Sequence, residues 1–207
     1  MPEARVIFAV AAERDDGLIW EWLRGLGHEL FAAGPISIKV GYFGREIVPP
    51  CRPFVSTRWA TNASDLQSLM DHARAHCVCG CFVNTGDILA EAAREAQQRP
   101  LQAVVIIGDH FSGNRDETLA QAEQLRAAGT RLFLFRQRAQ GAPPDDVFET
   151  LAKATNGVYY EFNPAVERIA ERLPRFFEAV AHYAIGGPAA LRGLLDETAD
   201  LLLEQIK

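Results

Sequence analysis

Three cysteines crowd one short stretch of the chain, at Cys77, Cys79 and Cys81, directly after His76. Thiolates and imidazoles at close spacing are ligands for zinc, and clustered thiols also suit redox chemistry. Structural zinc sites usually take two separated Cys-x2-4-Cys pairs, and the remaining cysteine, Cys51, stands alone. We therefore expect these cysteines to pack as small apolar side chains, without zinc, and keep a zinc or redox loop as the alternative.

A second chemically suggestive stretch is Gly108-Asp109-His110, which follows an apolar strand pattern. An adjacent carboxylate and imidazole would suit the base of a hydrolase. Neighbouring residues at a strand end face opposite ways, however, and the chain has no Gly-x-Ser-x-Gly nucleophile motif. No Gly-x-Gly-x-x-Gly motif follows a strand, which argues against a dinucleotide site. We expect a protein that is not an enzyme.

Alternating strand and helix patterns must position these residues. The expected strands are the apolar or β-branched runs 6–12, 36–43, 101–107, 130–135 and 157–162, with a proline-rich edge strand over 48–57. The expected helices are 17–33, 62–76, 86–98, 117–128, 145–155, 164–185 and 189–206, with a kink or break at Pro174 and a stop at Gly186-Gly187. Arg136 and Arg138 are expected as solvated residues at the end of a strand.

This alternation predicts an α/β fold: a Rossmann-like, doubly wound, mostly parallel six-stranded sheet with one antiparallel edge strand and a C-terminal helical extension. Ligands of such sheets bind beyond the carboxyl ends of the strands. The loops after Ala12, around 77–86 and after Ile107 should therefore lie at one edge, which we call the carboxyl edge.

Composition narrows the class of protein. The chain has 207 residues, 48% of them hydrophobic, and a net charge of −6. This size suits one domain with its own core, and the acidic balance argues against a nucleic-acid partner. No apolar run is long enough to span a membrane and the N-terminus has no signal-peptide pattern, so we expect a cytoplasmic protein without a membrane partner.

Several stretches together resemble the von Willebrand factor A family. They are VVIIGD (104–109), LAQAEQLRAAGTRLFLF (119–135) and LAKATNGVYY (151–160), with the first strand at Val6–Val10. The resemblance covers residues 4–185 and implies a Rossmann-like domain. Residues 186–207 resemble a helical extension of a bacterial subgroup, which we expect to pack on that domain.

The resemblance also implies a metal-ion-dependent adhesion site that holds Mg²⁺ or another divalent cation. The family's first loop reads Asp-x-Ser-x-Ser, but here the leading aspartate position is Ala11 and the serine positions carry Glu13 and Asp15. Arg14 adds a positive charge that disfavours a cation.

The other ligand positions of the family are a threonine and a second aspartate. The threonine position falls near Val83, with Thr85 two residues away, whereas Asp109 matches the aspartate. We therefore expect a protein–protein interaction or scaffolding module with a degenerate metal site and no cofactor. The alternative is a divalent-cation site rebuilt from Glu13, Asp15 and Asp109. The expected binding surface for a protein partner comprises Glu13, Arg14, Asp15, Thr85, Asp109 and His110. The sequence leaves the oligomeric state open.

Overall fold

A parallel sheet forms the centre of the computed structural model, which describes residues 3–11, 23–43, 55–76, 85–108, 111, 113–138, 146–163, 169–194 and 196–206. Its strands are β1 (Ala4–Ala11), β2 (Ile36–Phe43), β3 (Val55–Ser56), β4 (Ala103–Gly108), β5 (Arg131–Gln137) and β6 (Val158–Phe162). The order across the sheet is β3-β2-β1-β4-β5-β6. All neighbouring pairs are parallel except β2 and β3. The expected parallel α/β architecture is confirmed.

The central strands are apolar because both of their faces are covered. In β1, Val6, Phe8 and Val10 belong to one buried cluster, and Ile7 and Ala9 belong to another. Alternate strand residues point to opposite faces, so a strand between two helical layers carries apolar residues on both faces.

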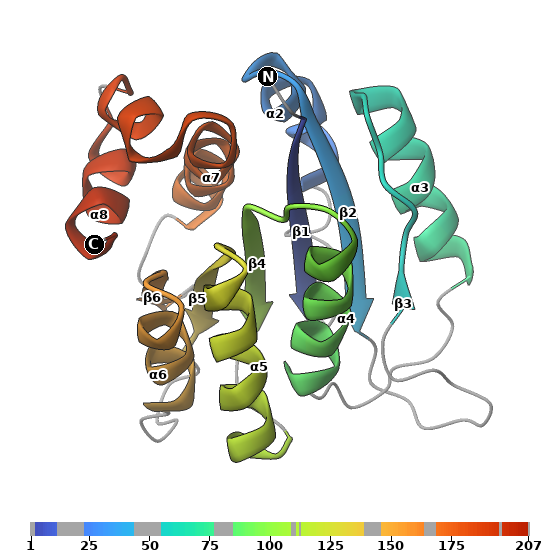
Figure 1. Ribbon diagram of the computed structural model, residues 1–207. Helices are drawn as coiled ribbons and strands as arrows, with labels where there is room; N and C mark the ends of the chain where they lie inside the picture. The colour runs from blue at the N-terminus through green and yellow to red at the C-terminus, as the bar shows by residue number, and fades with distance from the viewer. Residues whose placement is uncertain are drawn as a thin grey trace.

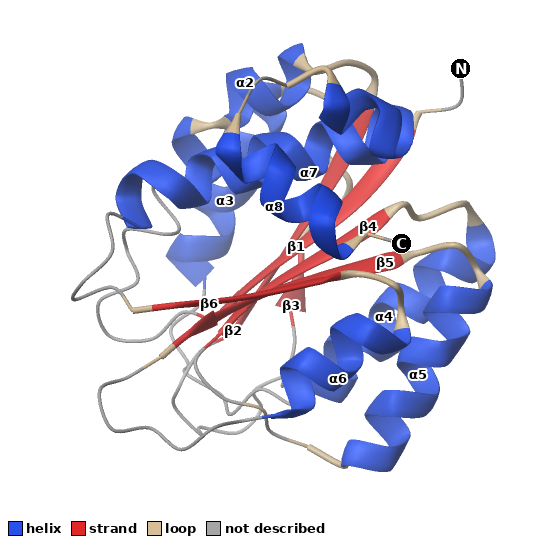
Figure 2. Ribbon diagram, turned by 90° about the vertical axis from the view of Figure 1, so that its left-hand side faces the viewer, coloured by secondary structure: helices blue, strands red, loops and turns tan. Residues whose placement is uncertain are grey.

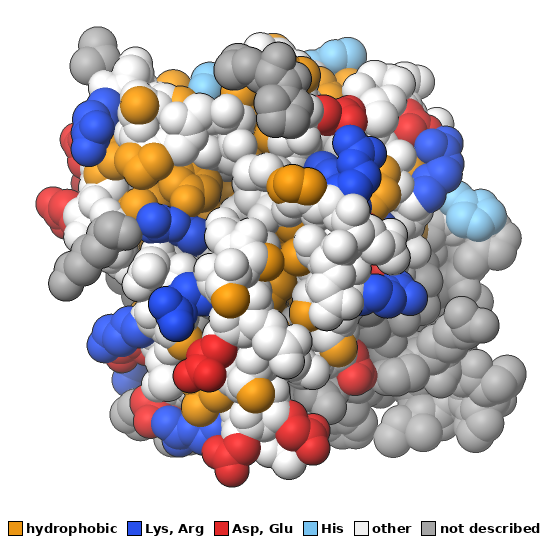
Figure 3. Space-filling model, in the orientation of Figure 1, with side chains coloured by type: hydrophobic (Ala, Val, Ile, Leu, Met, Phe, Trp, Pro, Cys, Tyr) orange, Lys and Arg blue, Asp and Glu red, His pale blue; other side chains and the backbone are white. Residues whose placement is uncertain are grey.

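The helices form two layers (Figures 1 and 2). One layer contains α2 (Gly27–Ala32), α3 (Ala63–His76), α7 (Ile169–Arg192) and α8 (Glu197–Gln205). The other contains α4 (Thr85–Gln98), α5 (Arg115–Ala127) and α6 (Asp146–Ala154). Acidic and basic side chains are interspersed over α5 and α6 (Figure 3).

The C-terminal helices differ from the sequence prediction. The helix α7 continues through Pro174, where a kink or break was expected. Its backbone is non-helical at Gly187, with φ 64° and ψ −159°, which agrees with the interruption expected at Gly186-Gly187. The single helix expected over 189–206 is wrong, because α7 ends at Arg192 and α8 begins at Glu197. The Asp196 side chain accepts a hydrogen bond from the Thr198 amide and so caps a new helix there. Leu191, Ala199 and Leu202 are buried in the same cluster as β1, so this segment packs on the sheet domain.

The antiparallel edge is short within the described residues. Of the expected proline-rich strand, Val55 and Ser56 form β3, and 48–54 lie outside the described residues. A bridge between Ile38 and Ala60 extends the pairing with β2. Of the expected helix over 17–33, the described part contains a helical turn at 23–25 and then α2.

Candidate functional site

The carboxyl ends of β1 and β4 lie side by side at one edge of the sheet. Val10 pairs with Ile107, so Ala11 and Gly108 both follow one residue further along their strands. The helix α4 begins at the same edge, at Thr85, near the lower end of the sheet in Figure 1. The tertiary structure therefore brings the ends of three elements together at the carboxyl edge, as the sequence predicts for its loops.

Thr85 is held against the protein interior rather than displayed on the surface. Only 4% of its surface is exposed. One turn further, Ile88 and Leu89 are buried in the same cluster as Ala9 and Ile106, which draws the start of α4 onto the sheet. A partner that approaches this edge meets little of Thr85.

Asp87 is an acidic residue at this edge that is not among the site residues predicted from the sequence. It lies in the first turn of α4 and is half-buried. Burial raises the pKa of the Asp87 carboxyl above its usual value. The signal for this residue was its place in the first helical turn, where the helix dipole favours an acidic side chain.

An ion-pair cluster occupies the carboxyl ends of β5 and β6. Arg136 lies opposite Glu161 in the strand register, and its Nη1 is 3.1 Å from Glu161 Oε2. Arg138 Nη1 lies 3.0 Å from the other carboxylate oxygen, and the Tyr159 hydroxyl donates to Oε2 at 2.8 Å. The expectation that Arg136 is solvated is wrong, because its side chain is only 3% exposed. The register that pairs it with Glu161 cannot be read from either strand alone.

The charges of this cluster act together on Glu161. Burial opposes its ionisation, but the hydrogen bond from Tyr159 and the guanidinium groups of Arg138 and Arg136 outweigh it and hold the pKa of Glu161 below its usual value. The two arginines and one glutamate leave one net positive charge, and Arg138 presents it with 48% of its side chain exposed.

Most of the sequence-predicted site residues lie outside the described residues. They are Glu13, Arg14, Asp15, Asp109, His110, Cys77, Cys79 and Cys81. Among the residues that the structure does describe, no cluster of three histidine, cysteine or acidic side chains is arranged to hold a metal. The carboxylate site and the cysteine loop therefore stay predictions.

Comparison with known proteins identifies the fold. No protein-family model matches the chain, and no curated protein matches it by sequence. Among solved structures, it is similar to a von Willebrand factor type A protein from Catenulispora acidiphila, with a TM-score of 0.62 and 10% identity over 89% of this chain. The pilus adhesin SpaC from Lactobacillus rhamnosus GG gives a TM-score of 0.66 with 10% identity over 89% of this chain. Manganese-loaded TRAP protein of Plasmodium vivax gives 0.55 with 14% identity over 83% of this chain.

The chain thus has a von Willebrand factor A-like fold, as the sequence resemblance predicts. It spans 43% of the Catenulispora protein, 31% of the adhesin and 73% of the Plasmodium protein. No helix in the described part of the chain is both long and apolar enough to cross a membrane.

Proposed function

We propose that this domain is a non-catalytic protein-binding module that contacts its partner through the carboxyl edge, and that its adhesion-type metal site is largely lost. The observation that supports this proposal best is the end of β1. This strand ends at Ala11, beside the end of β4 at Gly108. The resemblance implies an aspartate ligand at the position of Ala11.

The residues at the family's ligand positions do not fit the coordination of a divalent cation in an adhesion site. Mg²⁺ requires near-octahedral coordination by oxygen ligands. An alanine methyl group cannot supply the leading ligand, and the threonine position near Val83 supplies no oxygen from its side chain. The nearby Thr85, the first residue of α4, is buried. Asp109 alone retains the family's ligand type.

The surroundings of the edge favour a protein partner. Charges of both signs stand there, with Arg138 exposed at the end of β5 and Asp87 half-buried at the start of α4. Mixed charges of this kind steer and orient a folded partner. Two neighbours by fold are a pilus adhesin from Lactobacillus rhamnosus GG and the PilB minor pilin from Streptococcus sanguinis. By that analogy we extend an interaction role to this chain.

Calorimetry tests the state of the metal site. We expect no binding heat when the purified protein is titrated with Mg²⁺, Mn²⁺ or Ca²⁺. Micromolar binding that Asp109→Ala abolishes would contradict a lost site and favour the rebuilt carboxylate site of Glu13, Asp15 and Asp109.

Affinity capture tests the binding surface. The double variant Glu13→Lys/Asp15→Lys should lose partners that the unmodified protein captures. The matched control is Glu29→Lys/Glu123→Lys, which makes the same change in charge at exposed positions of α2 and α5. Equal capture by both double variants and the unmodified protein would contradict the proposed surface.

A further inference from the structure

The strand β6 ends the described sheet on one side and pairs only with β5 there. Backbone groups of alternate strand residues point to opposite sides. The Phe162 carbonyl accepts a hydrogen bond from the backbone amide of Arg138, the residue that follows β5, so it faces β5. The Tyr159 amide instead donates to the Gln205 side chain, which lies outside the sheet. The backbone groups of Tyr159 and Glu161 therefore face the open edge of the sheet.

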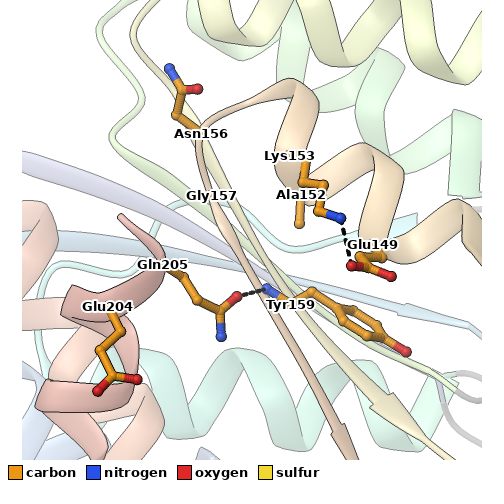
Figure 4. Close-up of a pocket in the computed structure, with 8 residues that line it drawn as sticks. All are labelled: Glu149, Ala152, Lys153, Asn156, Gly157, Tyr159, Glu204 and Gln205. Carbon is orange, nitrogen blue, oxygen red and sulfur yellow. Dashed lines mark hydrogen bonds and ion pairs between the residues drawn. The ribbon is translucent and has the colours of Figure 1, made fainter. Parts of the chain in front are cut away.

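A side chain from α8 takes the place of a neighbouring strand at this edge. The Tyr159 N–H donates to Gln205 Oε1 at 2.9 Å, and the two residues are 46 positions apart (Figure 4). An unpaired sheet edge is a template for another strand, and proteins commonly cover it. Here the cover is one hydrogen bond, which the exposed Gln205 side chain accepts near the end of α8, and an incoming backbone carbonyl can replace that acceptor.

A hollow surrounds this part of the edge. We call it the β6 groove; its volume is about 670 Å³, within the range of ligand sites. Its lining includes Glu149 and Lys153 of α6, Gly157 and Tyr159 of β6 and its turn, and Glu204 and Gln205 of α8. Helices flank the edge from both faces of the sheet, so a single extended segment fits better than the sheet edge of a second folded domain.

The turn that forms one wall of the groove is constrained before any ligand binds. Asn156 has φ 52°, and the Gly157 amide donates to the Ala152 carbonyl at 2.8 Å. A Cβ atom at Gly157 would lie 1.9 Å from the Leu132 carbonyl oxygen, so β6 lies tightly against β5 at this point. A preformed edge reduces the ordering cost of binding.

The charges of the groove select the occupant. Lys153 Nζ lies 2.6 Å from Glu149 Oε1, so these two charges compensate each other. Glu204 has no ion-pair partner among the described residues and leaves one net negative charge. A lysine or arginine side chain would complement it.

We propose that the β6 groove binds an extended peptide segment of a partner protein, which adds a strand to β6 and places a lysine or arginine near Glu204. Main-chain hydrogen bonds to the outward groups of Tyr159 and Glu161 would supply general affinity, and the basic side chain would supply selectivity. The lining of the β6 groove includes neither Arg138 nor the start of α4, and the proposal does not depend on the function proposed for the carboxyl edge.

A phage-displayed library of random twelve-residue peptides, selected on the whole protein, provides the probe. The enriched peptides should contain lysine or arginine among strand-forming residues. Their synthetic versions should shift the amide signals of Tyr159 and Glu161 in ¹⁵N NMR spectra. Methylation of alternate peptide nitrogens should abolish binding, because it removes donors of the added strand.

Three variants make the test specific. Glu204→Lys should weaken binding about tenfold or more, since it replaces a charge-assisted contact by repulsion. The matched control Glu123→Lys, on the exposed face of α5, should leave the affinity unchanged. Gln205→Ala should strengthen binding about two- to tenfold, because it removes the competing acceptor for the Tyr159 amide.

Several outcomes would overturn the proposal. One is a selection whose peptides leave the Tyr159 and Glu161 amides unshifted. Another is binding that is lost in Glu13→Lys/Asp15→Lys but kept in Glu204→Lys, which would assign the peptides to the carboxyl edge. A dimer in sedimentation velocity that Glu204→Lys dissociates would identify a second copy of the chain as the occupant instead.

Discussion

The Arg5 guanidinium lies over the Trp59 indole, with its central carbon 4.0 Å from the ring centre. The same guanidinium pairs with Glu95, whose carboxylate also pairs with Lys39 and accepts from Trp59 Nε1 at 3.2 Å. Lys39 Nζ makes a second ion pair, 3.1 Å from Glu91 Oε1. This network joins β1, β2 and α4, and Glu95 is its central acceptor.

Removal of the Glu95 carboxylate should be costly for stability. Its side chain is 10% exposed, and those of Arg5 and Lys39 are 5% and 9% exposed, so Glu95→Ala leaves buried cations without their shared partner. We expect a loss of about 3–5 kcal/mol in the free energy of unfolding, measured by urea denaturation. The control Glu149→Ala removes an exposed i,i+4 ion pair and should cost about 0.5 kcal/mol or less. Equal losses in the two variants would refute the central role of Glu95.

The same residue should make stability depend on pH. Burial opposes ionisation of Glu95, but bonds from Lys39, Arg5 and Trp59 hold its pKa below the usual value of 4.5. A carboxyl group whose pKa is lower in the folded protein than in the unfolded chain stabilises the folded protein at pH values above the unfolded-state pKa. This contribution is lost as the pH falls through the folded-state pKa. The urea midpoint should therefore fall as the pH drops below 4.5.

The variant Glu95→Gln isolates that contribution. It should be less stable than the unmodified protein at neutral pH and lose less stability on acidification. A residual decline should remain, because the pKa values of Glu161 and Asp196 are also lowered. If the stability of Glu95→Gln declines as steeply on acidification as that of the unmodified protein, Glu95 is not the main cause of the loss of stability at low pH.

The turn into β6 should tolerate no side chain at Gly157. A Cβ atom there would lie 1.9 Å from the backbone oxygen of Leu132, which cannot move without disturbing the pairing of β5 and β6. Gly157→Ala should cost about 3 kcal/mol or more, measured as a fall in the urea midpoint. Gly25→Ala is the control, since nothing lies within 4 Å of a Cβ atom at that helical position. It should leave stability unchanged or raise it by up to about 1 kcal/mol.

The tyrosine beside the ion-pair cluster should report on Glu161. Burial and the hydrogen bond to Glu161 raise the pKa of Tyr159 above its usual value of 10.0, although Arg136 acts in the opposite direction. Glu161→Gln removes the negative charge and keeps Arg136, so the pKa of Tyr159 should fall. NMR titration of ¹³C-labelled tyrosine measures it directly. Burial raises the pKa of Tyr183 too, but Glu161 does not contribute to that shift, so Tyr183 should titrate unchanged in the variant.

Local sequence patterns predicted the strands well, because burial of one or both faces of a strand restricts which residue types its positions can carry. The run ISIKVGYF at 36–43 coincides with β2, and the strand expected over 101–107 overlaps β4, which runs from Ala103 to Gly108. The C-terminal helices were harder to predict. Leucines spaced for one continuous helix over 189–206 could not reveal that Asp196 caps a separate helix.

The sequence by itself determined the alternation of strands and helices, and hence a parallel sheet with ligand loops at its carboxyl edge. Only the tertiary structure decided which charged residues are buried together. Arg5 and Glu95 are 90 residues apart, and Tyr159 and Gln205 are 46 apart, so no local spacing connects them. Strand order and register bring these residues together, and both depend on the packing of the whole chain. For that reason the β6 groove became visible only in the folded protein.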